Sequence, residues 1–190
     1  MTDRKDEIIK IATVLFSENG YDNTSIRELA RNVELSVAGL YYFFQNKEEI
    51  LFNILNRTLT SLLEYVQLAI NKDNDPQTNI TKVIDHFVKE VVDNKMEIVL
   101  LLKESQRLKP EQLAIIKKKE RGVIKLIKNE ISRLSNEGRL KNFNLTSTTF
   151  TLLAIINFTR YWYDPRGQLS TKEFVTETTD LFLNGVLNNQ

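Results

Sequence analysis

Residues 24–49 constrain the fold most, because their pattern predicts two short helices separated by a tight turn. Ser25, followed three positions later by Glu28, is typical of a capping box at the start of the first helix, which we expect to end near residue 32. Ser36 can cap the second helix. The apolar residues expected on its buried side are Leu40, Phe43 and Phe44. Two short helices joined by about four residues match a helix-turn-helix, whose second helix enters the major groove of DNA.

The chain resembles the TetR family of bacterial transcription regulators in two runs, T-S-I-R-E-L-A at 24–30 and S-V-A-G-L-Y-Y-F-F-Q-N-K-E-E-I-L at 36–51. The serine, the paired aromatic residues and the lysine of the second run agree with the family in their spacing. The resemblance implies a homodimer of all-α subunits of about nine helices that binds a palindromic double-stranded DNA operator. We expect a helix-turn-helix DNA-binding domain at 1–48 and a helical effector-binding and dimerisation domain at 49–190.

The resemblance also implies which side chains contact DNA. The residues expected to contact phosphates are Thr24, Ser25, Ser36, Tyr41, Tyr42 and Lys47. The residues expected at the base-facing end of the second helix are Val37, Ala38 and Gly39. Phosphate contacts position the protein, whereas contacts with base edges specify the sequence. Because residues 37 and 38 are small and apolar, they can pack on thymine methyl groups but cannot donate a pair of hydrogen bonds, so we expect sparse direct readout.

Two positions depart from the family pattern. Glu34 stands in the turn where the family usually has glycine, and a residue with a side chain held at positive φ costs about 1 kcal/mol or more. The turn is therefore either strained or different in geometry. Phe43 occupies a place often held by histidine or a polar aromatic residue, which removes one phosphate donor.

Composition argues against an enzyme, a metal site or a cofactor. The chain has no cysteine and one histidine, His86, and it contains no glycine-rich phosphate loop and no pair of carboxylates at a recognisable catalytic spacing. The first ten residues are charged where a signal peptide would be apolar, and no apolar run approaches the ~20 residues of a membrane span. We therefore expect a cytoplasmic protein that does not enter a membrane.

Charge gives a mixed signal. The net charge is +1, and the first 60 residues hold 7 basic and 9 acidic residues, which weakens the expected electrostatic attraction to DNA. Residues 103–128 hold 9 basic and 3 acidic residues. We interpret this basic run as a solvated helix face, and contact with a phosphate-bearing ligand is the alternative.

Apolar residues recur at helical spacing through the rest of the chain. The expected helices cover about residues 3–19, 46–70, 76–92, 96–108, 110–137, 145–163 and 170–186. The segment at 145–163 is apolar nearly all round and needs cover on two sides. Pairing of the last two helices with their symmetry mates would supply that cover, so we expect the homodimer interface there.

A second resemblance concerns the effector. The stretch R-Y-W-Y-D-P-R-G-Q-L-S at 160–170 is similar to a TetR-family branch of fatty-acid and steroid degradation repressors that respond to acyl-CoA thioesters. It implies an apolar tunnel for an acyl chain in a repressor that the acyl-CoA releases from DNA. The expected lining residues are Phe87, Val91, Leu101, Leu102, Ile127, Phe150, Leu153, Asn157 and Tyr161. The motif is also compatible with a simple turn, which leaves a multidrug or hydrophobic-compound sensor, and more remotely a helical protein-interaction module, as alternatives.

Overall fold

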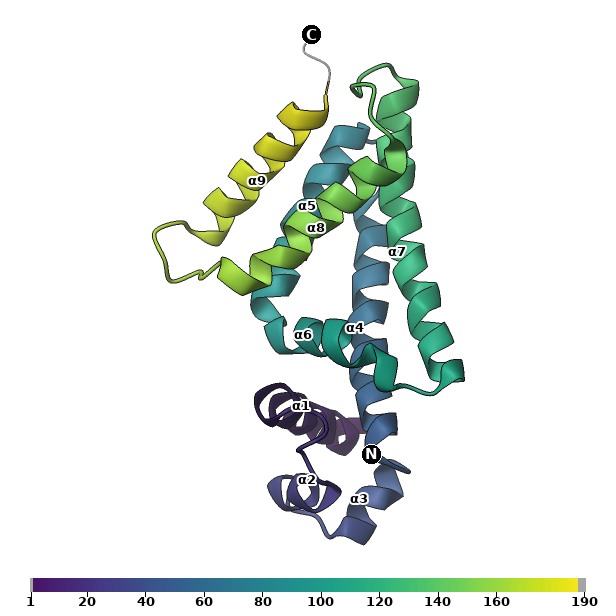
Figure 1. The fold of residues 1–190 in the computed structure, drawn as a ribbon, viewed down its shortest axis with the longest axis vertical. Helices are drawn as coiled ribbons and strands as arrows, with labels where there is room; N and C mark the ends of the chain where they lie inside the picture. The colour runs from purple at the N-terminus through teal and green to yellow at the C-terminus, as the bar shows by residue number, and fades with distance from the viewer. Residues whose placement is uncertain (1, 188–190) are drawn as a thin grey trace. The chain divides into compact units, whose positions relative to one another are not determined.

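The computed structural model describes residues 2–187, apart from the side chains of residues 2, 160 and 162. Within this range the fold is all-α, as the sequence predicts, with nine α-helices and one short 3₁₀ helix (Figure 1). The helices are α1 (Thr2–Asn19), α2 (Ile26–Asn32), α3 (Val37–Phe43), α4 (Lys47–Ala69), α5 (Pro76–Asp93), α6 (Lys95–Glu104), η1 (Ser105–Arg107), α7 (Pro110–Asn136), α8 (Leu145–Trp162) and α9 (Thr171–Val186). None of the described helices is both long enough and apolar enough to cross a membrane.

Local capping signals account for several helix starts. The predicted capping box opens α2: the Ser25 hydroxyl accepts a hydrogen bond from the Glu28 N–H at 3.1 Å, and the Glu28 carboxylate accepts one from the Ser25 N–H at 3.4 Å. Ser170 and Glu173 form a second capping box at α9. Asp75 caps α5, whose first position is a proline. These starts follow from residues adjacent in sequence, which is why the pattern predicts them.

The chain packs as two compact units. One comprises Met1–Ser61 with Met96–Lys119, and the other comprises Leu62–Lys95 with Glu120–Gln190. Helices α4 and α7 contribute residues to both units. These units reflect packing rather than activity, so the predicted functional boundary between residues 48 and 49 stays a prediction.

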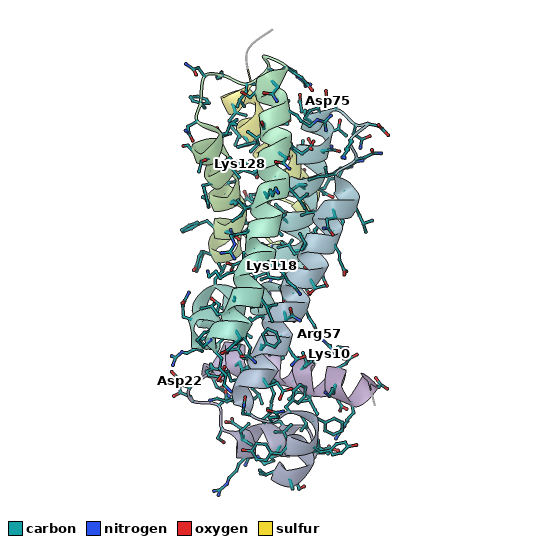
Figure 2. The ribbon with its side chains drawn as sticks, turned by 90° about the vertical axis from the view of Figure 1, so that its right-hand side faces the viewer. Lys10, Asp22, Arg57, Asp75, Lys118 and Lys128 are labelled. Carbon is teal, nitrogen blue, oxygen red and sulfur yellow. The ribbon has the colours of Figure 1, made fainter. Side chains whose placement is uncertain are left out.

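In the first unit, α1, α2, α3 and the first turns of α4 contribute side chains to a small apolar core. Its buried side chains include Ile8, Ala12, Phe16, Leu29, Leu40, Phe44 and Ile50. Phe43, which was expected on the buried side of its helix, is only half-buried and packs edge-on against Tyr42, with ring centroids 5.2 Å apart. Outside this core, Arg57 of α4 pairs with Asp6 of α1 at 2.5 Å (Figure 2).

In the second unit, α5 packs against both α8 and α9 (Figure 1). Its buried apolar face is Ile80, Val83, Ile84, Phe87, Val88 and Val91. A buried polar network fixes the loop between α4 and α5 onto α7: the Asn79 amide donates to the Glu130 carboxylate at 2.8 Å, and Arg133 donates to the same carboxylate at 2.9 Å and to the Asn74 carbonyl at 3.0 Å. Because Asn79 is fully buried, its hydrogen bonds offset the cost of removing its amide from water.

The basic run at 103–128 is only partly a solvated face. Lys118 is exposed on α7, whereas Lys128 on the same helix donates to the Thr146 hydroxyl at 2.8 Å (Figure 2). Lys119 donates to the Asn56 side chain at 2.5 Å. Several cations of the run therefore make contacts within the chain.

Candidate DNA-binding and effector sites

Helix α3 presents an aromatic face to solvent. The Ser36 hydroxyl caps the helix by accepting a hydrogen bond from the Gly39 N–H at 3.0 Å. Leu40 and the following Phe44 are buried and anchor the helix, and Tyr42 on the outer side is 72% exposed. The other predicted contact residues of this helix are Tyr41 and Ala38, which are exposed, and Val37 and Gly39, which are half-buried. This face therefore offers phenol hydroxyls and small apolar groups to a ligand.

Thr24 does not have the environment expected of a phosphate contact. It is fully buried, and its hydroxyl donates toward the carbonyls of Gly20 at 2.9 Å and Leu15 at 3.2 Å. In this arrangement the hydroxyl has no accessible surface, so a phosphate contact by the Thr24 side chain would require it to move, and that contact stays a prediction. The neighbouring Ser25 is exposed, but its hydroxyl already caps α2.

Lys47 is half-buried, and its ammonium contacts the loop after α1. Its ammonium donates to the carbonyls of Tyr21 at 2.6 Å and Thr24 at 2.9 Å, lies 3.4 Å from the Asp22 carbonyl, and sits 4.3 Å from the centroid of the Tyr21 ring. Burial lowers the pKa of Lys47 below its ordinary value, against the opposing effect of Asp22. A phosphate contact would compete with these carbonyls for the same three N–H donors.

The turn between α2 and α3 is strained at the position that departs from the family pattern. Glu34 has φ of 53°, and it is the only described residue other than glycine with positive φ. The sequence left two alternatives for this turn, a strained backbone or a different geometry. The positive φ of Glu34 favours the strained backbone. Arg4 of α1 donates to the Val33 carbonyl beside it at 2.5 Å. Sequence reasoning missed Arg4, because its acceptor is a backbone carbonyl 29 positions away and carries no side-chain signal.

The residues predicted to line an effector tunnel differ in their burial. Phe87, Val91, Ile127 and Leu153 are buried in the second unit, and Leu101 is buried in the first. Three other predicted lining residues, Leu102, Phe150 and Tyr161, are exposed, and Asn157 is half-buried. These three side chains are not enclosed within their own unit, and their contact with an effector stays a prediction.

The second unit contains a surface pocket of about 350 Å³ where α5 meets the end of α8. Its lining residues are Val91, Val92, Lys95, Thr159, Tyr161, Tyr163, Asp164, Pro165 and Arg166. Of the predicted set, only Val91 and Tyr161 line it. Asp164 accepts from Arg166 at 3.0 Å, and this ion pair holds the pKa of Asp164 below its usual range. The Trp162 side chain of the same sequence motif lies outside the described residues.

Comparison with known families decides the identity of the fold. Residues 8–54 match the family model described as bacterial regulatory proteins, tetR family, and residues 73–186 match the model described as tetracyclin repressor-like, C-terminal domain. The chain belongs to the TetR family. Regulators of this family bind operator DNA as dimers and respond to small-molecule effectors, and they are not enzymes. Among the described residues, no group of three or more histidine, aspartate or glutamate side chains could hold a metal ion.

Three TetR-family relatives illustrate the match. The chain is 26% identical to the HTH-type transcriptional regulator HbdR of Aromatoleum sp. (strain CIB), over 84% of this chain and 69% of that protein. It is also 26% identical to IcaR of Staphylococcus aureus (strain Newman), the negative transcriptional regulator of the biofilm operon icaADBC, over 84% of this chain and 82% of that protein. AibR, solved in complex with isovaleryl coenzyme A and operator DNA, has the same fold, with a TM-score of 0.86 at 24% identity over 94% of this chain and 97% of AibR.

The last two helices of this TetR-family chain carry exposed apolar side chains. Phe150, Phe158 and Tyr161 are exposed on α8, and their spacing places them on one helix face. Leu181 on α9 is 77% exposed. Large apolar side chains gathered on adjacent elements mark interaction surfaces more often than scattered ones do. Phe150, which was expected to line the tunnel, lies on this exposed face, and Tyr161 on the same face also lines the surface pocket.

Proposed function

We propose that this TetR-family member is a homodimeric repressor that places α3 of each protomer in successive major grooves of a palindromic operator. The observation that carries the proposal is the Ser36-capped α3, which is anchored by Leu40 and turns Tyr41 and Tyr42 outward. Similarity to IcaR, a negative regulator, supports repression rather than activation. The required half-site spacing is about 34–36 Å, one turn of DNA.

The contacts assigned to α3 follow from its exposed face. Tyr41 and Tyr42 donate hydroxyls to phosphates, and Ala38, with Val37 and Gly39 beside it, faces the bases. Ser25 and Ser36 stand at the N-termini of α2 and α3, where exposed backbone N–H groups also attract phosphate. Since these contacts include few cations, operator affinity depends weakly on salt compared with more basic DNA-binding proteins.

The homodimer interface in this proposal is the outer face of α8 and α9. Phe150 and Phe158 from α8 and Leu181 from α9 would pack against the same residues of a second copy, which makes a four-helix arrangement. Packing these side chains together removes apolar surface from water. Each Å² of buried apolar surface contributes about 25 cal/mol of favourable free energy.

The proposed effector is apolar, with an acyl-CoA thioester as the first candidate. AibR, which shares the fold, binds isovaleryl coenzyme A. The pocket at the end of α8 combines the aliphatic Val91 and Val92 with the cations Lys95 and Arg166, a pairing suited to an acyl group with anionic phosphates beside it. Its volume of about 350 Å³ is at the lower end for ligand pockets and suits a short acyl group.

A cationic hydrophobic compound is the second candidate effector, because the same pocket also holds Tyr161, Tyr163 and the carboxylate of Asp164. Aromatic faces and a carboxylate together attract organic cations. An acyl-CoA would therefore contact the cations of this pocket, whereas a cationic compound would contact its aromatic rings and its carboxylate.

The test combines DNA binding with thermal unfolding. The purified protein is screened against genomic fragments for sequence-specific binding, and its unfolding midpoint is measured with acyl-CoAs of increasing length, coenzyme A, free fatty acids and cationic drugs. A ligand at 100 times its Kd stabilises the native state by about 2.7 kcal/mol, which shifts the midpoint clearly. Binding of one fragment that weakens when the stabilising ligand is added supports the proposal. Equal binding to every duplex, abolished by salt, would reject it.

A further inference from the structure

We propose that the pocket at the end of α8 selects an apolar ligand with one negative charge, that Lys95 binds this charge, and that Asp164 excludes a second one. This inference rests on the proposed function, because it names the effector class of the same pocket. All the residues that line the pocket belong to the second unit. What the pocket can bind depends on which of its polar groups are already paired within the chain.

Two buried hydroxyl groups of the pocket are used inside the protein. The Tyr163 hydroxyl donates toward the Leu169 carbonyl and the Thr171 hydroxyl, each at 3.1 Å. The Thr159 hydroxyl donates to the Ile155 carbonyl at 3.0 Å. A hydroxyl has a single hydrogen to donate, so neither group has one left for an anion. These two residues therefore present carbon and lone pairs to the pocket.

Arg166 is neutralised by Asp164. Its Nε and Nη2 atoms donate to the two carboxylate oxygens at 3.0 and 3.1 Å, and its backbone N–H donates to the same carboxylate at 3.0 Å. This two-bonded geometry is the one in which a guanidinium and a carboxylate pair best. The hydrogen bond from Arg166, and to a smaller extent the charge of Lys95, lowers the pKa of Asp164, so the carboxylate is ionised at pH 7. The pair thus adds no net charge to the pocket.

Lys95 is the cation of the pocket that is left for a ligand. Its side chain is exposed, and its ammonium makes no hydrogen bond or ion pair with any residue that the structure describes. Asp93 and Glu97, the acidic residues nearest to it in sequence, do not line the pocket. Lys95 is also the first residue of α6, where the helix dipole disfavours a cation. Neither an ion pair nor the helix therefore accounts for a lysine at this position.

The charges of the pocket define the class of ligand. Among the described lining residues, two cations and one carboxylate leave a net charge of +1. A cationic ligand would meet Lys95 without an opposing free carboxylate, and a second negative charge would meet Asp164. A volume of about 350 Å³ suits a short branched or aromatic body. The carboxylate of a short acid, or one phosphate of a coenzyme A thioester, would supply the single negative charge.

Four small ligands with matched carbon skeletons test this selectivity. Isovalerate carries one negative charge, 3-methylglutarate carries two, isovaleramide is neutral and 3-methylbutylammonium is positive. Their binding to the full-length protein is measured by titration calorimetry at low salt. We expect isovalerate to bind at least about fivefold more tightly than each of the other three. Isovaleryl coenzyme A and coenzyme A, in the same assay, show whether a carboxylate or a phosphate supplies the charge.

Substitutions assign the charge selectivity to residues. Lys95→Gln should bind isovalerate no more tightly than isovaleramide, whereas Lys82→Gln, which removes an exposed lysine of α5 outside the pocket, should match wild type. Asp164→Asn frees Arg166, so the preference for isovalerate over 3-methylglutarate should fall at least about threefold. The double variant Asp164→Asn with Arg166→Gln keeps the net charge and should keep the wild-type preference.

Equal binding of isovalerate and isovaleramide by wild type would overturn the inference, as would tighter binding of 3-methylbutylammonium or an unchanged preference in Lys95→Gln. Binding of isovaleryl coenzyme A that depends on Lys95, without binding of isovalerate, supports the inference and assigns the charge to a phosphate. Binding of none of these compounds overturns it. A protein that shows this charge selectivity but binds no DNA sequence specifically retains the selective pocket and loses the proposed function, so the two failures are distinguishable.

Discussion

The guanidinium of Arg107 donates to the carboxylate of Asp22 at 2.5 Å, across 85 positions of sequence. Both residues belong to the first unit, and Asp22 is labelled in Figure 2. Close by in sequence, the Lys109 N–H donates to the Glu48 carboxylate at 2.7 Å. The segment between α6 and α7 therefore contacts both the loop after α1 and the first turn of α4. The loop after α1 therefore contacts both Lys47 and the segment that leads into α7.

This relationship predicts a coupling role for Arg107. An exposed ion pair contributes only about 0–1 kcal/mol to folding, so Arg107→Gln should leave the free energy of unfolding nearly unchanged. If the segment transmits the effector state to the DNA-binding unit, the factor by which effector weakens operator binding should shrink at least about threefold. The measurement is operator affinity with and without the acyl-CoA that gives the largest thermal shift.

The matched control for Arg107 is Lys89→Gln, which removes another exposed ion pair, with Asp85 on α5. We expect the control to keep the full effector response. An identical response in Arg107→Gln and wild type would show that this ion pair does not carry the coupling.

Relieving the strained turn should stabilise the protein. Because Glu34 is held at φ of 53°, Glu34→Gly removes a steric cost of about 1–2 kcal/mol, partly offset by the greater freedom of glycine in the unfolded chain. We expect a net gain of about 0.5–1 kcal/mol in the free energy of unfolding, measured by urea denaturation. Glu34→Ala retains Cβ and should show no such gain. Equal stabilisation by both substitutions would assign the effect to the lost carboxylate rather than to the backbone.

The proposed dimer face is tested by charge. Leu181→Asp places a carboxylate in the interface between α9 and its symmetry mate, where it would be buried without a partner. We expect the molar mass from sedimentation or light scattering to fall toward the monomer at micromolar concentration. Leu68→Asp is the matched control, because Leu68 on α4 is 84% exposed and lies outside that face. A dimer that survives Leu181→Asp but dissociates with Leu68→Asp would place the interface elsewhere.

Sequence patterns predicted those features that depend on near neighbours. The capping box of Ser25 and Glu28 fixes the start of α2 within four residues, and the family resemblance singled out Glu34 as the anomaly of the turn. The hydrogen bonds of Lys47 within the chain could not be predicted in the same way. Its acceptors are backbone carbonyls more than 20 positions away, and any residue type supplies a carbonyl. A lysine in a DNA-binding motif therefore looks the same in sequence whether it contacts phosphate or loop.

A single sequence also does not show which apolar side chains are buried only when the protein assembles. Phe150 and Tyr161 fall on an apolar helix, and apolarity alone does not distinguish a pocket wall from an interface with a second copy. Both residues were predicted to line a tunnel and both are exposed, and Tyr161 also lines the surface pocket at the end of α8. The inward side of the same helix, which includes Leu153, is buried. Helical periodicity identifies two faces, and only packing shows what each face meets.

His86 is half-buried on α5, and its ring stacks on Tyr65. Its Nε2 is buried without a hydrogen-bond partner among the described residues, 3.6 Å from the Glu90 carboxylate. Burial lowers the pKa of His86 to about 4, with Asp85 raising it and Lys89 lowering it by smaller amounts. The histidine is therefore neutral in the folded protein at pH 7.

A folded-state pKa below the unfolded value of about 6.5 means that the unfolded chain binds more protons between those two values. Stability is then fully present above pH 6.5 and falls as the pH drops toward 4. The full shift corresponds to about 3 kcal/mol, and residual solvent contact reduces the expected loss to about 1–2 kcal/mol. His86→Phe keeps a ring on Tyr65 and removes the titration, so its free energy of unfolding should fall less over this range and should equal or exceed that of wild type at pH 7. Urea denaturation of both proteins from pH 4.5 to 7.5 makes the comparison, and parallel pH profiles would assign the acid sensitivity to other groups.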